Sequence, residues 1–173
     1  KSILVVNYPS DYLSFYPDTN AKRNLKKVAL VIGRHGSIQK NSEAILDTFV
    51  NTSAKNSVEL VFVGPCTDEF LRKLKATEQQ KLNVKLAGNV KCRARYQEIL
   101  RQADFSLLCS RWEGFPLAYA EAILSGLHVA GLEHFEFLRR FQQRGIQSSA
   151  HKTISDIFLF IQSVDITKEK MYR

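Results

Sequence analysis

Short apolar runs rich in branched residues alternate along the chain with longer segments in which apolar residues recur every three or four positions. A strand that is buried on both faces reads as a continuous apolar run, whereas one face of a helix repeats at the longer spacing. The predicted strands are Ile3–Val6, Val28–Ile32, Val58–Val63, Val84–Leu86, Phe105–Cys109 and Val129–Leu132. The predicted helices are Ser42–Val50, Thr67–Gln79, Tyr96–Gln102, Leu117–Leu124 and a last one after Ala150, around Ile154 and Ile161.

This alternation favours an α/β fold, in which the strands lie parallel and helices cover both faces of the sheet. We expect a sheet of about six strands within three layers. Gly33, Gly64 and Gly88 directly follow or end apolar runs, where the chain needs a tight turn.

Composition excludes several classes of protein. The chain has 173 residues, 45% of them hydrophobic and 24% charged, which fits one globular domain and not a disordered or low-complexity chain. The apolar runs are far shorter than the roughly 20 residues of a membrane-spanning helix. Three widely spaced cysteines predict neither a disulfide framework nor a zinc site, so we expect a reducing, cytoplasmic setting. The chain begins with Lys1 and its only methionine is Met171, so we expect a piece of a longer protein.

The formal net charge of +8 favours anionic partners. Phosphates, nucleic acid and acidic lipid headgroups all remain open on charge alone. In open parallel sheets, ligands bind beyond the carboxyl ends of the strands. The loops expected there are Gly33–Lys40, Gly64–Asp68, Gly88–Arg95 and Ser110–Pro116. They carry several cations, which can bind phosphate, and the aromatic residues Trp112 and Phe115, which can pack against a ring. These loops therefore suit a phosphorylated ligand that contains a ring.

The loop and helix over Ser110–Ala122 carry the most specific chemistry. Pro116 suits the first position of a helix, because its fixed φ and missing N–H cost nothing there. The free N–H groups of Leu117 and Ala118 would then form an anion site together with the helix dipole. Glu121 is a charged residue on an otherwise apolar predicted helix. Its carboxylate either accepts hydrogen bonds from ligand hydroxyls or lies on a narrow face of the helix that is exposed to solvent. Glu113 lies in the same loop, either facing a ligand or solvated.

Glu113 and Glu121 are separated by seven residues within Glu-Gly-Phe-Pro-Leu…Glu-Ala, followed by Ser125-Gly126. This closely resembles the E-x7-E signature of the retaining glycosyltransferases of family 4. Further matches cover most of the chain: Val31-Ile32-Gly33-Arg34, Lys40-Asn41, Val61-Phe62-Val63-Gly64 and Val84-Lys85-Leu86-Ala87-Gly88-Asn89-Val90. The resemblance implies a three-layer Rossmann-like domain that forms one half of a GT-B fold.

That family resemblance also implies an organisation and an activity. Residues 1–173 would form a single nucleotide-sugar-binding domain, the C-terminal half of the enzyme, and the N-terminal acceptor domain would be absent from this chain. The whole enzyme would transfer a sugar from a UDP- or GDP-sugar to a saccharide or lipid-linked acceptor, with membrane contact only through the parent protein. The isolated domain would be inactive. No metal or other cofactor and no nucleic acid partner is expected.

The resemblance assigns roles to individual residues. Arg34 and Lys40 would contact the donor diphosphate, and Glu113 would lie near the transferred sugar. Glu121 would accept hydrogen bonds from the ribose hydroxyls. The remaining candidate donor contacts are Gly33, Val90, Gly114, Phe115, Leu117 and Ala118.

The chain departs from the family pattern after Gly131, where Leu132-Glu133-His134-Phe135 replaces a glycine-rich turn that commonly helps to hold the donor sugar. Two other functions stay open. One is a non-catalytic α/β module that binds nucleic acid or another anion, and the other is a sugar-nucleotide epimerase domain.

Overall fold

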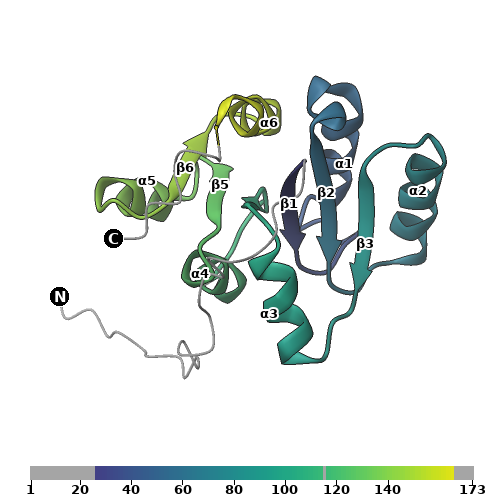
Figure 1. Cartoon of the computed structure of the whole chain (residues 1–173), viewed down its shortest axis with the longest axis horizontal. Coiled ribbons are helices and arrows are strands. Elements are labelled where there is room, and N and C mark those ends of the chain that lie inside the picture. Colours follow the sequence, from purple (N-terminus) through teal and green to yellow (C-terminus); the bar gives the residue numbers. More distant parts are fainter. Residues whose placement is uncertain (1–25, 115, 166–173) are drawn as a thin grey trace.

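A computed structural model describes residues 26–114 and 116–165. Within them, a six-stranded parallel sheet has the order β3-β2-β1-β4-β5-β6 (Figure 1). The strands are β1 (Lys27–Ile32), β2 (Val58–Val63), β3 (Val84–Gly88), β4 (Phe105–Leu108), β5 (His128–Leu132) and β6 (Ser148–His151). The helices are α1 (Ser42–Asn51), the 3-10 turn η2 (Ser53–Asn56), α2 (Asp68–Gln79), α3 (Arg93–Arg101), α4 (Leu117–Leu124), α5 (Glu136–Gln143) and α6 (Ile154–Ser163).

The three-layer α/β fold is confirmed. Helices α1, α2 and α6 bury Phe49, Phe70 and Phe158 on one face of the sheet. Helices α3, α4 and α5 bury a second cluster on the other face, including Leu100 and Leu138. Figure 1 shows α2 beside β3 at one end of the sheet, and α5 and α6 beside β5 and β6 at the other. Apolar burial on both faces explains why the central strands carry no polar alternation.

Two elements were missing from the sequence prediction. The edge strand β6 reads Ser-Ser-Ala-His, so no apolar run marks it, and it pairs only with β5 among the described strands. Helix α5 does carry a helical signal, because Phe137, Leu138 and Phe141 are spaced three or four residues apart. The predicted strand Ile3–Val6 lies outside the described residues.

Three helix starts differ from the prediction, the least at α2, which begins at Asp68 with Thr67 as its N-cap. Helix α3 begins at Arg93, three residues before the predicted start at Tyr96. Pro116 is the N-cap of α4 and not its first helical residue, with φ −81° and ψ 81°. Its missing N–H is harmless at either position, since the first amides of a helix have no partner within it. Helix α4 itself has the predicted bounds.

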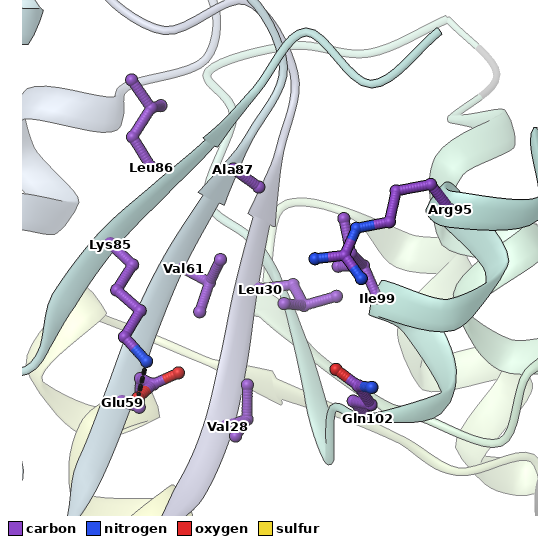
Figure 2. Close-up of a pocket in the computed structure, with 10 residues that line it drawn as sticks. All are labelled: Val28, Leu30, Glu59, Val61, Lys85, Leu86, Ala87, Arg95, Ile99 and Gln102. Carbon is purple, nitrogen blue, oxygen red and sulfur yellow. Dashed lines mark ion pairs between the residues drawn. The ribbon is translucent and has the colours of Figure 1, made fainter. Parts of the chain in front are cut away.

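The two faces of the sheet are not equally covered. Helix α3 leads from the edge strand β3 to β4, across β2 and β1. It leaves Lys85 exposed and Val61 half-buried on that face. A cavity of about 290 Å³ lies there, floored by strand side chains and walled by α3 (Figure 2). None of the helices in the described part of the chain is long and apolar enough to cross a bilayer.

Candidate functional site

The carboxyl ends of β1, β2 and β3 meet in close backbone contact. The N–H of Gly33 donates to the carbonyl of Val63 at 2.9 Å, and the N–H of Gly64 donates to the carbonyl of Gly88 at 2.8 Å. A Cβ at Gly64 would lie 2.0 Å from the carbonyl oxygen of Gly33, and the φ of Gly64 is +132°. Only glycine allows this approach. At these strand ends, close backbone contacts therefore hold β1, β2 and β3 together and leave no room for a side chain at Gly64.

A cavity of about 340 Å³ opens on this edge. That volume is within the usual range for a small-molecule site, roughly 300 to 1,000 Å³. Its walls combine two cations, a tyrosine and apolar side chains. They are Ile32, Gly33, Arg34, Lys40, Val63, Gly64, Pro65, Asn89, Val90 and Tyr96.

Lys40 joins this cavity to the loop after β4. Its aliphatic carbons lie over Gly33, so a Cβ at Gly33 would stand 2.8 Å from Lys40 Cε. Its Nζ then reaches Glu113 Oε1 at 2.5 Å. The side chains are only 19% and 8% exposed, far less than those of the surface pairs Lys73–Asp47 and Arg95–Glu98. An ion pair this shielded from water is stronger than a surface pair and is costly to break.

Backbone and side-chain hydrogen bonds fix the Glu113 loop against the Lys40 loop. The N–H of Arg111 donates to the carbonyl of Gln39 at 2.8 Å, and Gln39 Nε2 donates to the carbonyl of Trp112 at 3.1 Å. Asn41 Nδ2 donates to the carbonyl of Cys109 at 3.3 Å. Asn41 has φ 55°, a left-handed conformation that asparagine tolerates well. The two loops therefore hold Lys40 and Glu113 in one geometry.

The segment that departs from the family pattern also reaches this edge. His134 Nε2 donates to the carbonyl of Ser110 at 3.1 Å, since a carbonyl can only accept. Arg139 of α5 pairs with Glu133 at 2.7 Å. The segment is thus tied to the start of the Glu113 loop, a contact that the sequence analysis missed.

Beneath the Lys40 loop, His35 is buried between Phe62 and Phe70, with ring centroids 5.1 and 5.6 Å away. Its Nδ1 lies 2.9 Å from Ser42 Oγ. Burial, together with a smaller effect of the nearby positive charge of Lys40, lowers the pKa of His35 to about 4. The ring is neutral at pH 7 and supports the loop as part of the core.

Glu121 points to the same region from α4. It is half-buried and accepts a hydrogen bond from the hydroxyl of Tyr96, which lines the cavity. Burial raises the pKa of Tyr96, and the negative charge of Glu121 raises it further. Sequence analysis placed Tyr96 at a helix start and gave it no role, although its place just after a strand-end loop was a usable signal.

The helix that carries Glu121 begins at the same edge. The N–H of Tyr119 donates to the carbonyl of Pro116 at 3.0 Å, so the hydrogen-bonded turns of α4 start there. The amides of Leu117 and Ala118 precede it, at the positive end of the helix dipole.

The predicted site residues therefore gather at one edge of the sheet. One cavity is lined by Gly33, Arg34, Lys40 and Val90. Glu113 is ion-paired with Lys40 of this cavity, and Glu121 is hydrogen-bonded to Tyr96, which also lines it. Gly114 and Leu117 are exposed on the adjoining loop and first helical turn, where Ala118 is half-buried. Phe115 lies outside the described residues.

The cavity on the sheet face has different chemistry (Figure 2). It lies against the middle of β1 and β2 and not at their carboxyl ends. Lys85 there pairs with Glu59 at 2.7 Å, and Arg95 pairs with Glu98 at 2.6 Å. Both of its cations are ion-paired, whereas at the carboxyl edge Lys40 is paired but Arg34 forms no ion pair with a described residue, so the carboxyl edge is the better anion site. Among the described residues, no group of three or more His, Cys, Asp or Glu side chains is placed to hold a metal ion.

Several solved structures share this architecture. The C-terminal domain of the glycosyl transferase group 1 family protein LpcC from Francisella tularensis is 19% identical, with a TM-score of 0.67 over 88% of this chain and 86% of that one. A TarM variant from S. aureus, solved with fondaparinux, α-GlcNAc-glycerol and UDP, is 18% identical, with a TM-score of 0.62 over 81% of this chain. HepE from Anabaena, solved with UDP and glucose, is 18% identical, with a TM-score of 0.58 over 80% of this chain.

The chain spans only 28% of the TarM chain and 38% of the HepE chain, so it corresponds to one part of those longer proteins. No curated protein sequence matches it. Residues 26–140, more than half of the chain, match the family described as Glycosyl transferases group 1. The chain therefore belongs to the group 1 glycosyl transferases, and its architecture is that of the C-terminal domain of a GT-B glycosyltransferase.

Proposed function

We propose that this chain is the donor-binding domain of a retaining glycosyltransferase of family 4. The enzyme would transfer a sugar from a UDP- or GDP-sugar to a saccharide or lipid-linked acceptor. The observation that carries the proposal is the cavity at the carboxyl edge of the sheet, whose lining combines Arg34 and Lys40 with apolar and aromatic groups. The UDP in the TarM and HepE structures supports a nucleotide diphosphate as the ligand class.

In this proposal, Arg34 and Lys40 hold the diphosphate. Negative charge grows on the diphosphate as the bond to the sugar breaks, so cations held in place stabilise the transition state more than the ground state. Lys40 can do so while it is paired with Glu113, because an ammonium has three N–H donors and the pair uses one. The amides of Leu117 and Ala118 would add donors at the positive end of α4.

Glu113 would act on the transferred sugar and not as a nucleophile. Its carboxylate is held by Lys40 at 2.5 Å, which orients it. A carboxylate has further acceptor positions, so Glu113 could accept hydrogen bonds from sugar hydroxyls and stabilise an oxocarbenium-like state. Retention would follow from a front-side displacement in which the leaving phosphate helps to deprotonate the acceptor.

The remaining parts of the proposal concern the parent protein. The acceptor-binding domain would belong to a longer chain, as the partial coverage of TarM and HepE suggests. We propose a cytoplasmic enzyme that meets a membrane only through that parent. We also propose that donor binding needs no metal, since the sequence has no Asp-x-Asp pair and both Arg34 and Lys40 can donate hydrogen bonds to the diphosphate oxygens.

Calorimetry with UDP, GDP and ADP tests the proposal on this chain. At least one diphosphate should bind, with affinity unchanged by a chelator. Lys40→Ala should weaken binding by about 1–3 kcal/mol, through the loss of a charged hydrogen bond. Lys73→Ala is the matched control, because Lys73 pairs with Asp47 on the outside of α1 and α2.

Two results would contradict the proposal. One is a folded chain that binds none of the three diphosphates. The other is binding of a short RNA whose affinity falls steeply with salt while the nucleotides have no effect, which would favour the non-catalytic module. Product analysis with the whole parent enzyme would separate a retaining transferase from an epimerase.

A further inference from the structure

Tyr96 connects two parts of the site that are far apart in the sequence. Its side chain lines the cavity that contains Arg34 and Lys40, and its hydroxyl donates a hydrogen bond to Glu121 on α4. It also packs against the apolar cluster that includes Val90 and Ala118.

The position of Tyr96 is set by the packing of α3. Ile99 and Leu100 of this helix are buried in the core. Arg95, Ile99 and Gln102 line the cavity on the sheet face, as Figure 2 shows. Tyr96 lines the other cavity, so α3 separates the two. A helix anchored in this way presents the tyrosine hydroxyl at a fixed place.

From this geometry we infer that Tyr96 is a positioning residue for nucleotide recognition, whose hydroxyl orients the Glu121 carboxylate toward the ribose hydroxyls of the donor. The inference rests on the proposed function and extends it to a residue with no previous role. The aromatic ring would at the same time form a wall of the cavity.

The chemistry of the pair supports this role. Burial and the charge of Glu121 keep the Tyr96 hydroxyl protonated at neutral pH, so it can only donate to the carboxylate. One donated hydrogen bond leaves other acceptor positions on the carboxylate. A ribose hydroxyl can occupy them, and the carboxylate loses less freedom on binding because it is already oriented.

The test compares a nucleotide that has ribose hydroxyls with one that has none. Calorimetry would measure UDP or GDP, whichever binds, and its 2′,3′-dideoxy counterpart, on the wild-type chain and on Tyr96→Phe. Loss of the orienting hydrogen bond should weaken the ribonucleotide roughly fivefold to tenfold. The dideoxy nucleotide should weaken by less than about twofold, because it makes no hydrogen bond to Glu121.

Two further variants complete the design. Glu121→Gln, like Tyr96→Phe, should reduce the preference for the ribonucleotide over the dideoxy nucleotide. Adding Tyr96→Phe to Glu121→Gln should reduce that preference little further. Gln102→Ala, at the C-cap of α3 and in the other cavity, should leave both affinities unchanged.

Equal weakening of both nucleotides by Tyr96→Phe would overturn the inference, since the hydroxyl would then contribute to binding by some route other than the ribose hydroxyls. Unchanged affinity for both would overturn it as well, while leaving the proposed function intact. Failure of the wild-type chain to bind any diphosphate would instead contradict the proposed function itself. Circular dichroism would verify that each variant is folded.

Discussion

Lys40 and Glu113 form an ion pair across 73 residues of sequence. Each residue is an ordinary charged side chain when read in the sequence. Burial makes the pair important, because the Glu113 carboxylate, whose side chain is only 8% exposed, needs a cationic partner in place of water. The same holds for Glu121 and Tyr96, where one half-buried carboxylate meets one phenol.

The first prediction concerns the strength of the Lys40–Glu113 pair. Removing either partner leaves the other poorly solvated, so Lys40→Ala and Glu113→Ala should each destabilise the fold, and the double variant should cost less than their sum. We expect a coupling of about 2 kcal/mol from urea unfolding of all four proteins. The pair between Lys73 and Asp47, which is 37% and 58% exposed, should give below about 0.5 kcal/mol. Equal coupling in the two pairs would show that burial adds nothing.

The second prediction concerns pH. Burial lowers the pKa of His35 and of His128 to about 4. His128 and His151 also share the hydroxyl of Ser149, at 3.0 and 2.8 Å. The unfolded chain, with a histidine pKa near 6.5, takes up these protons first as the pH falls. Stability should therefore be full above about pH 7 and fall as the pH drops toward 4, by roughly 2 kcal/mol for each histidine at pH 5.

Urea unfolding at pH 7 and pH 5 measures this loss. His35→Asn and His128→Gln retain the hydrogen-bonding nitrogen positions but cannot titrate, so each should reduce the difference between the two pH values by its own share. A difference that both variants leave unchanged would assign the pH dependence to carboxylates.

At the scale of elements, hydrophobic periodicity predicts what is locally encoded. The bounds of α4 and the positions of β1 and β2 were predicted closely, because each is marked by its own apolar residues. Strand β6 was missed, since an edge strand with two buried serines needs no apolar run of its own. Its place depends on β5 beside it, which is a tertiary contact.

Lys27 uses its positive charge within the fold. It begins β1, and its Nζ donates to the carbonyls of Ile161 and Gln162 at 2.6 and 2.7 Å. These carbonyls lie at the C-terminal end of α6, where a helix is electronegative. Part of the positive charge therefore stabilises the fold and is not directed at a ligand.

The third prediction concerns the strand ends. Gly64→Ala should destabilise the chain by about 3 kcal/mol or more, because its Cβ would collide with the backbone of Gly33 and its φ is unsuited to alanine. Gly88→Ala is the control: its φ is +71° but nothing lies within 4 Å of a Cβ there. It should cost only about 1 kcal/mol, the strain of a left-handed residue. Similar losses in the two variants, measured by thermal unfolding, would contradict the close approach.

At the scale of the whole molecule, one sheet joins both apolar clusters. Leu30 and Leu108 contribute to one cluster, and Val31 and Leu107 contribute to the other, so neither face can lose its packing without disturbing the shared strands.

The fourth prediction is therefore a single unfolding transition. Far-UV circular dichroism and calorimetry should give the same midpoint, with equal calorimetric and van't Hoff enthalpies. Two separated transitions would show that the two halves of the sheet fold independently. A nucleotide diphosphate at 100 times its Kd should increase the free energy of unfolding by about 2.7 kcal/mol and thereby raise the midpoint temperature.

The alternation of apolar runs and helical segments was sufficient to establish the α/β class, the order of most elements and the glycine-rich strand ends, because these depend on periodicity and backbone freedom within short stretches. The family resemblance of the Glu113–Glu121 segment supplied the candidate residues and the glycosyltransferase class. Folding was needed to pair Lys40 with Glu113, to bring Tyr96 to Glu121 and to commit Lys27 to a helix end. Those contacts join residues that are distant along the chain, and desolvation acts on them only after folding has buried them.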